Sequence, residues 1–106
     1  MRSNITIFNS TIGRGDGAIE INGEEILIFK KSIATRLLFG AIGAALAHGK
    51  EAMRFTAADI QSYQIEKKTF TDRMTITLKD SGFVTFNLKN EIRETIMPIL
   101  EGINPS

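Results

Sequence analysis

The segment Met74–Leu88, MTITLKDSGFVTFNL, decides the fold because hydrophobic and polar side chains alternate along both of its halves. Successive side chains of a strand point to opposite faces, so each half predicts a strand with one buried face. Asp80-Ser81-Gly82 lies between the halves and is typical of a turn. The segment therefore predicts an antiparallel hairpin, whose buried positions are Met74, Ile76, Leu78, Val84, Phe86 and Leu88.

Shorter hydrophobic stretches on the N-terminal side of this hairpin predict further strands. They span residues 4–8, 18–21, 25–30, 53–55 and 60–67. Asn22-Gly23 separates the second from the third and is a strong two-residue turn signal, because both residues tolerate positive φ. The segment Gly13–Gly17 contains the tripeptide Arg14-Gly15-Asp16, but its glycines predict a turn rather than an adhesion motif. Together with the hairpin, these stretches make about seven strands.

Residues 90–103 predict an amphipathic C-terminal helix. One hydrophobic stripe of helical spacing runs through Ile92, Ile96, Ile99, Leu100 and Ile103. Asn90 is the expected N-cap, and Pro98 is expected to bend the helix because it lacks an N–H donor. A bent antiparallel sheet, or a partly open barrel, with this helix covering one end would bury every hydrophobic face. The expected fold class is α+β, mainly β, in a single domain over residues 1–106.

The segment 33–48, IATRLLFGAIGAALAH, is expected to form a Gly/Ala-rich apolar helical insertion between strands. A helix of this length spans about 22 Å, shorter than the ~30 Å hydrocarbon core of a bilayer, so no transmembrane span is expected. Gly40 and Gly43 each weaken a helix by about 1 kcal/mol, which close approach of another backbone would offset. Either the helix packs on its own sheet, or it mediates self-association or contact with a membrane surface. The expected interaction residues are Leu38, Phe39, Gly40, Ile42, Gly43 and Leu46.

Basic residues flank this insertion and are the expected contacts to anionic lipid. They are Lys30, Lys31, Arg36, Lys50 and Arg54, while Lys67, Lys68 and Arg73 line the next hairpin. Basic side chains beside an apolar element are what a peripheral membrane contact requires. The alternative is that these residues belong to ordinary solvated loops.

Composition argues against several classes of function. The 106 residues carry a formal net charge of +1, which does not favour nucleic acid as a partner. The chain has no cysteine, and its single histidine, His48, is expected at a helix end rather than in a metal or catalytic site. We therefore predict no catalytic, cofactor-binding or metal-binding residue and no enzymatic activity. The first residues lead directly into a strand without an apolar signal segment, so a cytoplasmic location is expected, with membrane association as the alternative.

Four segments carry a resemblance to a known family: residues 23–29 (GEEILIF), 55–63 (FTAADIQSY), 74–86 (MTITLKDSGFVTF) and the closing helix 91–103. In this order they resemble the pleckstrin-homology-like (PH-like) superfold, in particular small bacterial PH-like and GRAM-like domains. The chain departs from that pattern at 33–48, where such domains have a shorter or more polar connection. The resemblance implies a non-enzymatic module that binds a lipid headgroup, a peptide or another subunit. We expect a binding or assembly module that self-associates or binds a protein partner, with peripheral binding to anionic lipid headgroups as the alternative.

Overall fold

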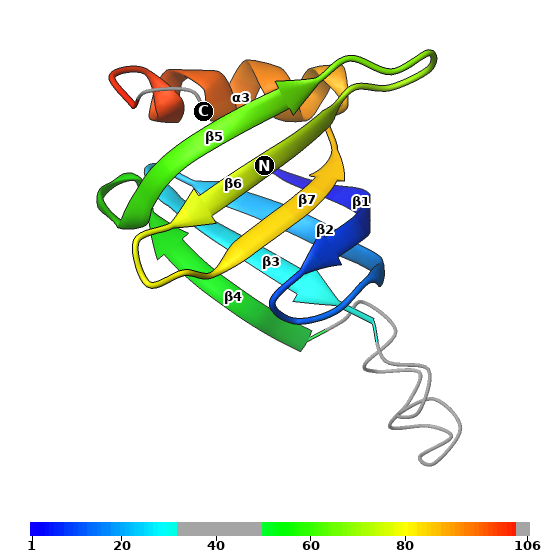
Figure 1. Cartoon of the computed structure of the whole chain (residues 1–106), viewed down its shortest axis with the longest axis horizontal. Helices are drawn as coiled ribbons and strands as arrows, with labels where there is room; N and C mark the ends of the chain where they lie inside the picture. Colours follow the sequence, from blue (N-terminus) through cyan, green and yellow to red (C-terminus); the bar gives the residue numbers. More distant parts are fainter. Residues whose placement is uncertain (32–49, 104–106) are drawn as a thin grey trace.

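Seven antiparallel strands form one curled sheet in the computed structural model, which describes residues 1–31 and 50–103 (Figure 1). The order across the sheet is β4-β3-β2-β1-β7-β6-β5, so β4 and β5 are its two edges. The strands are β1 (Arg2–Ser10), β2 (Gly15–Asn22), β3 (Glu25–Lys30), β4 (Lys50–Thr56), β5 (Ile60–Glu66), β6 (Arg73–Leu78) and β7 (Phe83–Asn87). A single 3-10 turn, η2 (Ala57–Asp59), joins β4 to β5, and the helix α3 (Asn90–Leu100) follows β7. The prediction of a mainly β fold built on a bent antiparallel sheet is confirmed, and the sheet has the form of a half-barrel.

The β6–β7 hairpin has the predicted register. Met74 pairs with Phe86, and Ile76 pairs with Val84. All six predicted core positions are buried, whereas the intervening Phe83 and Thr85 are only partly buried. The alternation of side chains along the sequence therefore becomes an alternation between core and surface.

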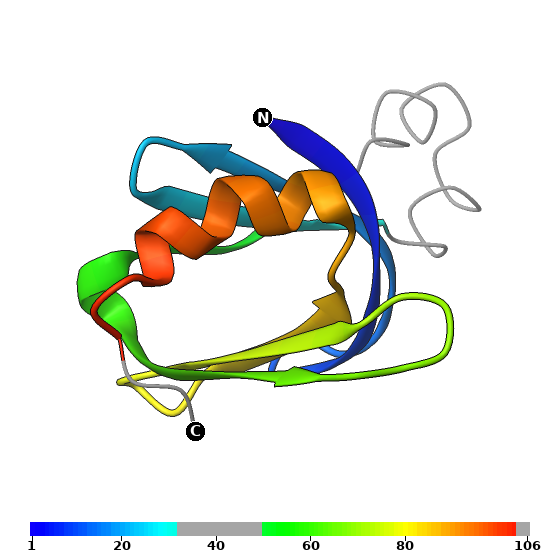
Figure 2. The same cartoon turned by 90° about the horizontal axis from the view of Figure 1, so that it is seen from above.

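The strand β1 joins the two halves of the sheet. It pairs with β2 from Arg2 to Ile7 and with β7 from Ile7 to Ser10, with an irregularity in the β7 pairing between Ile7 and Asn9. A bulge of this kind bends a strand and increases its twist. Figure 2 shows the result, in which β1 forms the wall between β2 and β3 on one side and β5 to β7 on the other. The predicted strand over residues 4–8 is therefore only the middle of a longer one.

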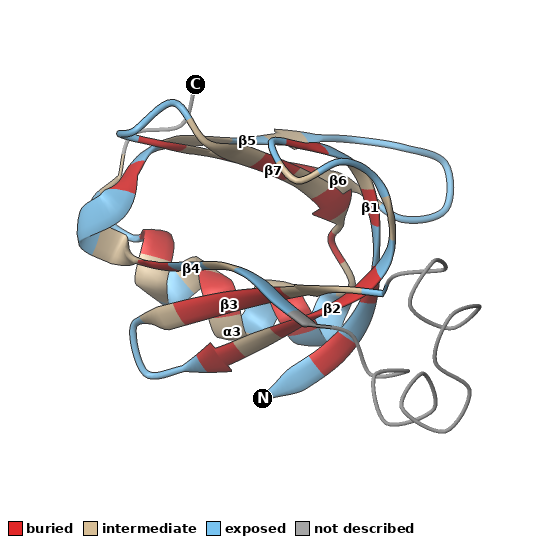
Figure 3. Ribbon diagram, turned by 90° about the horizontal axis from the view of Figure 1, so that it is seen from below, coloured by how far each residue is buried: buried red, intermediate tan, exposed pale blue. Residues whose placement is uncertain are grey.

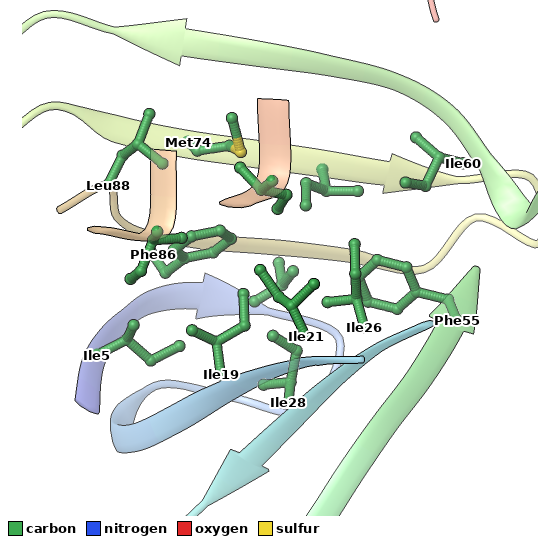
Figure 4. Packing of buried hydrophobic residues seen from close by; sticks show 14 of the residues in the cluster. Ile5, Ile19, Ile21, Ile26, Ile28, Phe55, Ile60, Met74, Phe86 and Leu88 are labelled. Carbon is green, nitrogen blue, oxygen red and sulfur yellow. The ribbon is translucent and has the colours of Figure 1, made fainter. Parts of the chain in front are cut away.

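The helix α3 lies across the open side of this half-barrel and completes the core (Figure 2). It buries Ile92, Ile96 and Leu100 against both halves of the sheet, as the predicted stripe requires. Figure 3 shows the buried positions on its inner side. The side chains that meet between the layers include Ile5, Ile19, Ile21, Ile26, Ile28, Phe55, Ile60, Met74, Phe86 and Leu88 (Figure 4).

Two predictions about the C-terminal helix need correction. The helix ends at Leu100 rather than at residue 103, because Gly102 adopts a φ of 90° and the Ile103 N–H donates to the Leu100 carbonyl over 2.9 Å. Asn90 is the first helical residue and not the N-cap, which is Lys89.

The two turns that flank β2 also differ from the sequence prediction. The β2–β3 turn is Gly23-Glu24, one residue later than Asn22-Gly23, since Asn22 pairs with Glu25 and Gly23 takes the positive φ of 61°. The strand β2 begins at Gly15, so residues 15–17 of the predicted turn Gly13–Gly17 belong to the strand. A Cβ atom on Gly17 would collide with the Phe29 carbonyl oxygen, so this position requires glycine for a close strand approach.

Two phenylalanines of β7 give a test of this register. Phe86 is fully buried, so Phe86→Ala should lower the free energy of unfolding by about 3–5 kcal/mol, measured by urea denaturation. Phe83→Ala is the matched control and should cost clearly less, because Phe83 faces the other side and is partly exposed. Equal losses at both positions would contradict the observed register.

Candidate binding surface

The loop between β5 and β6, residues 67–72 (KKTFTD), presents a phenylalanine to solvent. Phe70 is 97% exposed. Strand pairing ends at Glu66 and Arg73, and the loop projects beyond the sheet (Figures 1 and 3). Burial of a phenylalanine side chain contributes about 1.5–3 kcal/mol, so a fully exposed one is a candidate contact for a partner.

Three adjoining surface hollows run from the base of this loop across β1 and β7 as far as Lys31. Their volumes are about 450, 280 and 270 Å³. The first two share Phe70 and Thr71, the last two share Lys89, and the first and third share Thr6 and Asn87. They therefore form one continuous surface. We call it the basic surface and define it by Phe70 and five basic residues on it or beside it in the loop: Lys31, Lys67, Lys68, Arg73 and Lys89. Arg93 also lines the second hollow but is paired with Asp72.

Asp72 holds the base of the loop against the helix. Its carboxylate accepts hydrogen bonds from the Lys68 backbone N–H at 3.3 Å and from the Arg93 guanidinium at 2.7 Å. Its carbonyl oxygen accepts one from the Leu88 N–H at 2.7 Å. The hydrogen bond from the Lys68 backbone, followed by that from Arg93, holds the pKa of Asp72 below its ordinary value, although desolvation opposes the shift. The loop base is therefore fixed, while Phe70 projects from it.

Arg73 and Asn87 organise the floor of the basic surface. The Arg73 guanidinium stacks over the Phe8 ring at 3.9 Å from its centroid, an arrangement that favours a cation. The Asn87 side-chain oxygen accepts a hydrogen bond of 2.7 Å from the Thr6 N–H. This bond joins β1 to β7 at the point where the hollows meet.

Positive charge predominates on the basic surface. Glu66 pairs with Lys68 at 2.6 Å, and the hydrogen bond from Lys68 lowers the pKa of Glu66. The carboxylate of Asp72 is paired with the Arg93 guanidinium. A further acidic residue, Asp16, lines the third hollow. The turns at the other ends of the same hairpins carry mainly acidic residues, namely Glu24, Asp59 and Asp80, with Glu25 at the start of β3 and Lys79 beside Asp80. A chain of net charge +1 therefore has a basic end and an acidic end.

The predicted contact residues are only partly brought together. Lys31 lines the basic surface. Lys30 turns its ammonium group towards Gly13 in the β1–β2 connection. Arg54 lies nearer the opposite end of β4 and pairs with Glu51 and Glu25, which raise the pKa of its guanidinium further above its ordinary value. The remaining predictions fall outside the described residues or side chains: Arg36, Leu38, Phe39, Gly40, Ile42, Gly43, Leu46 and His48, together with the side chain of Lys50.

A second concave feature lies between α3 and the edge strand β5. This groove has a volume of about 690 Å³, and its hydrophobic lining includes Tyr63, Met97, Pro98 and Ile103. The outer edge of β5 has no neighbouring strand within the part of the chain that the structure describes. Unpaired backbone groups beside an apolar groove can receive an extended segment of another chain.

Two further observations concern the described residues as a set. Over residues 1–31 and 50–103, no cluster of histidine, cysteine, aspartate or glutamate has the geometry to hold a metal ion. Within the same ranges, no helix has the length and hydrophobicity that a membrane span needs.

Sequence reasoning missed Phe70, although a signal was present. The loop places an aromatic residue between two threonines and directly after two lysines, in a segment with no hydrophobic periodicity. An aromatic residue outside any periodic hydrophobic pattern is not expected in the core. Its presence in a polar loop therefore indicates an exposed residue that can contact a partner.

Comparisons with known proteins add no relative. No protein-family model matches the chain, and no curated protein matches it in sequence. The charge and the shape of the basic surface are therefore the basis for inferring a function.

Proposed function

We propose that this protein is a non-enzymatic, PH-like binding module that associates peripherally with anionic membrane surfaces. The observation that carries the proposal is the basic surface, on which Lys31, Lys67, Lys68, Arg73 and Lys89 gather at one end of a chain whose net charge is only +1. Anionic lipids attract such clusters, and each basic residue near the headgroups contributes about 1 kcal/mol. The curled seven-stranded sheet with a C-terminal helix across its open side supports the PH-like part of the proposal.

The strength of this attraction is modest. Four or five basic contacts supply about 4–5 kcal/mol, which corresponds to a dissociation constant of about 1 mM or slightly below. Binding of this kind is reversible and sensitive to salt, because exposed charges are screened over about 10 Å at 0.1 M salt. A stable association needs a second contribution besides charge.

The groove between α3 and β5 favours a second function, the binding of a protein partner. An extended segment that added to β5 would satisfy its outer backbone groups and place a hydrophobic side chain against Tyr63 and Met97. Self-association through Leu38, Phe39, Gly40, Ile42, Gly43 and Leu46 stays a prediction, because these residues lie outside the described ranges.

Vesicle binding tests the membrane proposal. The protein should sediment with vesicles of phosphatidylcholine that contain phosphatidylserine, less so as salt rises, and not with phosphatidylcholine alone. Lys67→Gln together with Lys68→Gln should weaken binding by about thirtyfold at low salt, since two contacts of about 1 kcal/mol are lost. Arg54→Gln together with Lys79→Gln removes the same charge elsewhere and should change binding by less than about twofold. Equal loss in both double variants, or equal binding to neutral vesicles, would refute the basic surface as the contact.

Peptide selection tests the protein-partner function. A random peptide library selected on the immobilised protein should yield extended hydrophobic sequences, whose binding is then measured by fluorescence anisotropy. Met97→Lys should weaken this binding at least tenfold, because it puts a charge into the groove. Met53→Lys changes a similarly half-buried methionine on β4 and is the matched control. Selected peptides that bind Met97→Lys as tightly as the wild type would exclude the groove.

A further inference from the structure

Phe70 occupies a position that neither folding nor the charge of the basic surface explains. Its side chain is 97% exposed, at the tip of a loop whose base is held by Asp72. Replacement by a polar residue would therefore cost the fold little, and yet the loop presents a large hydrophobic ring to water. The lysines just before it, Lys67 and Lys68, are exposed beside it.

We propose that Phe70 is a membrane anchor, which inserts into the interfacial layer of an anionic bilayer while Lys67 and Lys68 contact the headgroups around it. This inference rests on the proposed function and names the group that holds the protein on the lipid. Aromatic and aliphatic side chains beside basic ones insert at the boundary between headgroups and acyl chains. The anchor supplies the second contribution that the charge of the basic surface lacks.

The shape and the charge of the loop favour a lipid surface as the occupant. The loop 67–72 projects beyond the sheet (Figure 1), and Phe70 in the middle of it is almost fully exposed. Its neighbours Thr69 and Thr71 are small enough for the ring to penetrate without them. A protein pocket for Phe70 would leave Lys67 and Lys68 to be matched separately, whereas a bilayer with anionic lipid offers hydrocarbon and negative charge in one surface. Single-stranded nucleic acid is bound on platforms of several aromatic side chains, and within the described ranges Phe70 is the one highly exposed ring.

The orientation implied by insertion agrees with the distribution of charge. When the loop tip enters the interface, Lys31 and Lys89 lie on the same continuous surface and face the headgroups. The acidic turns at Glu24, Asp59 and Asp80 lie at the other ends of the hairpins. These turns lie across the molecule from the β5–β6 loop (Figure 1), so that this orientation keeps their acidic residues away from the negative lipid.

The chain has no tryptophan, so Phe70→Trp introduces a single fluorescent reporter at the proposed anchor. With vesicles of phosphatidylcholine and phosphatidylserine, its emission should shift to the blue and should be quenched by lipids brominated near the headgroup end of the acyl chains. Phe83→Trp, on β7 next to the β6–β7 turn, is the control and should show neither change.

Affinity measurements complete the experiment. Phe70→Ser should weaken binding to the anionic vesicles about tenfold, and Phe70→Leu should retain most of it, while urea denaturation shows both variants to be as stable as the wild type. If no variant and no wild-type protein binds anionic vesicles, the proposed function itself fails. If the wild type binds in a lysine-dependent way but Phe70→Ser binds equally well and Phe70→Trp does not shift, the function stands and the anchor is refuted. A shift on addition of a single-stranded oligonucleotide, and none with vesicles, would assign the surface to nucleic acid and overturn the proposal.

Discussion

The pairing of β1 with two different strands is the constraint on which the rest of the structure depends. Its first half hydrogen-bonds to β2 and its second half to β7, with the bulge after Ile7 between the two. Without β1, the strands β2 to β4 and β5 to β7 would be separate sheets, each too small to bury α3. The basic surface depends on the same strand, because Lys31 belongs to one half of the sheet and Lys68 and Arg73 belong to the other. The Thr6–Asn87 hydrogen bond lies where these two contributions meet.

The separation of charge follows from the curl of the sheet and not from the order of its turns. In an antiparallel sheet built from hairpins, successive turns lie at alternate ends of the strands. The pairings place Lys30 and Lys31 at the same strand ends as Asp80, and Lys67 and Lys68 at the same strand ends as Glu24. Because the bend in β1 turns one half of the sheet against the other, Lys31 and Lys68 nevertheless lie on one continuous surface. A composition that is nearly neutral therefore produces a molecule with two oppositely charged ends. Such an arrangement orients a protein in the field of a charged surface without requiring a large net charge.

The parts of the fold that were predictable are those whose signal is local. The alternation in Met74–Leu88 and the helical stripe of residues 92–100 each need only a short window, and both are confirmed. The full length of β1 and β4 was not predictable, because Arg2 and Glu51 are polar residues that become strand members only by pairing with neighbours. The turn at Gly23-Glu24 was misplaced by one residue because register is set by the partner strand as well as by the turn. The basic surface was not predictable as a unit, since only the curl of the sheet brings Lys31 and Lys68 onto one continuous surface. Arg54, by contrast, was predicted to contact lipid only because it lies near the segment 33–48 in the sequence.

The two candidate surfaces are not independent of each other, because Arg93 takes part in both. Its guanidinium bonds to Asp72 at the base of the Phe70 loop, and its side chain also lines the groove between α3 and β5. A partner in the groove that offered a carboxylate to Arg93 would compete with Asp72 for the same donors. The loop base would then lose one of the bonds that fix it, although the Lys68 N–H and the Leu88 N–H would still hold Asp72. Residues in one hydrogen-bond network couple by about 0.5–3 kcal/mol, so occupation of the groove and contact at the loop are expected to influence each other through this side chain.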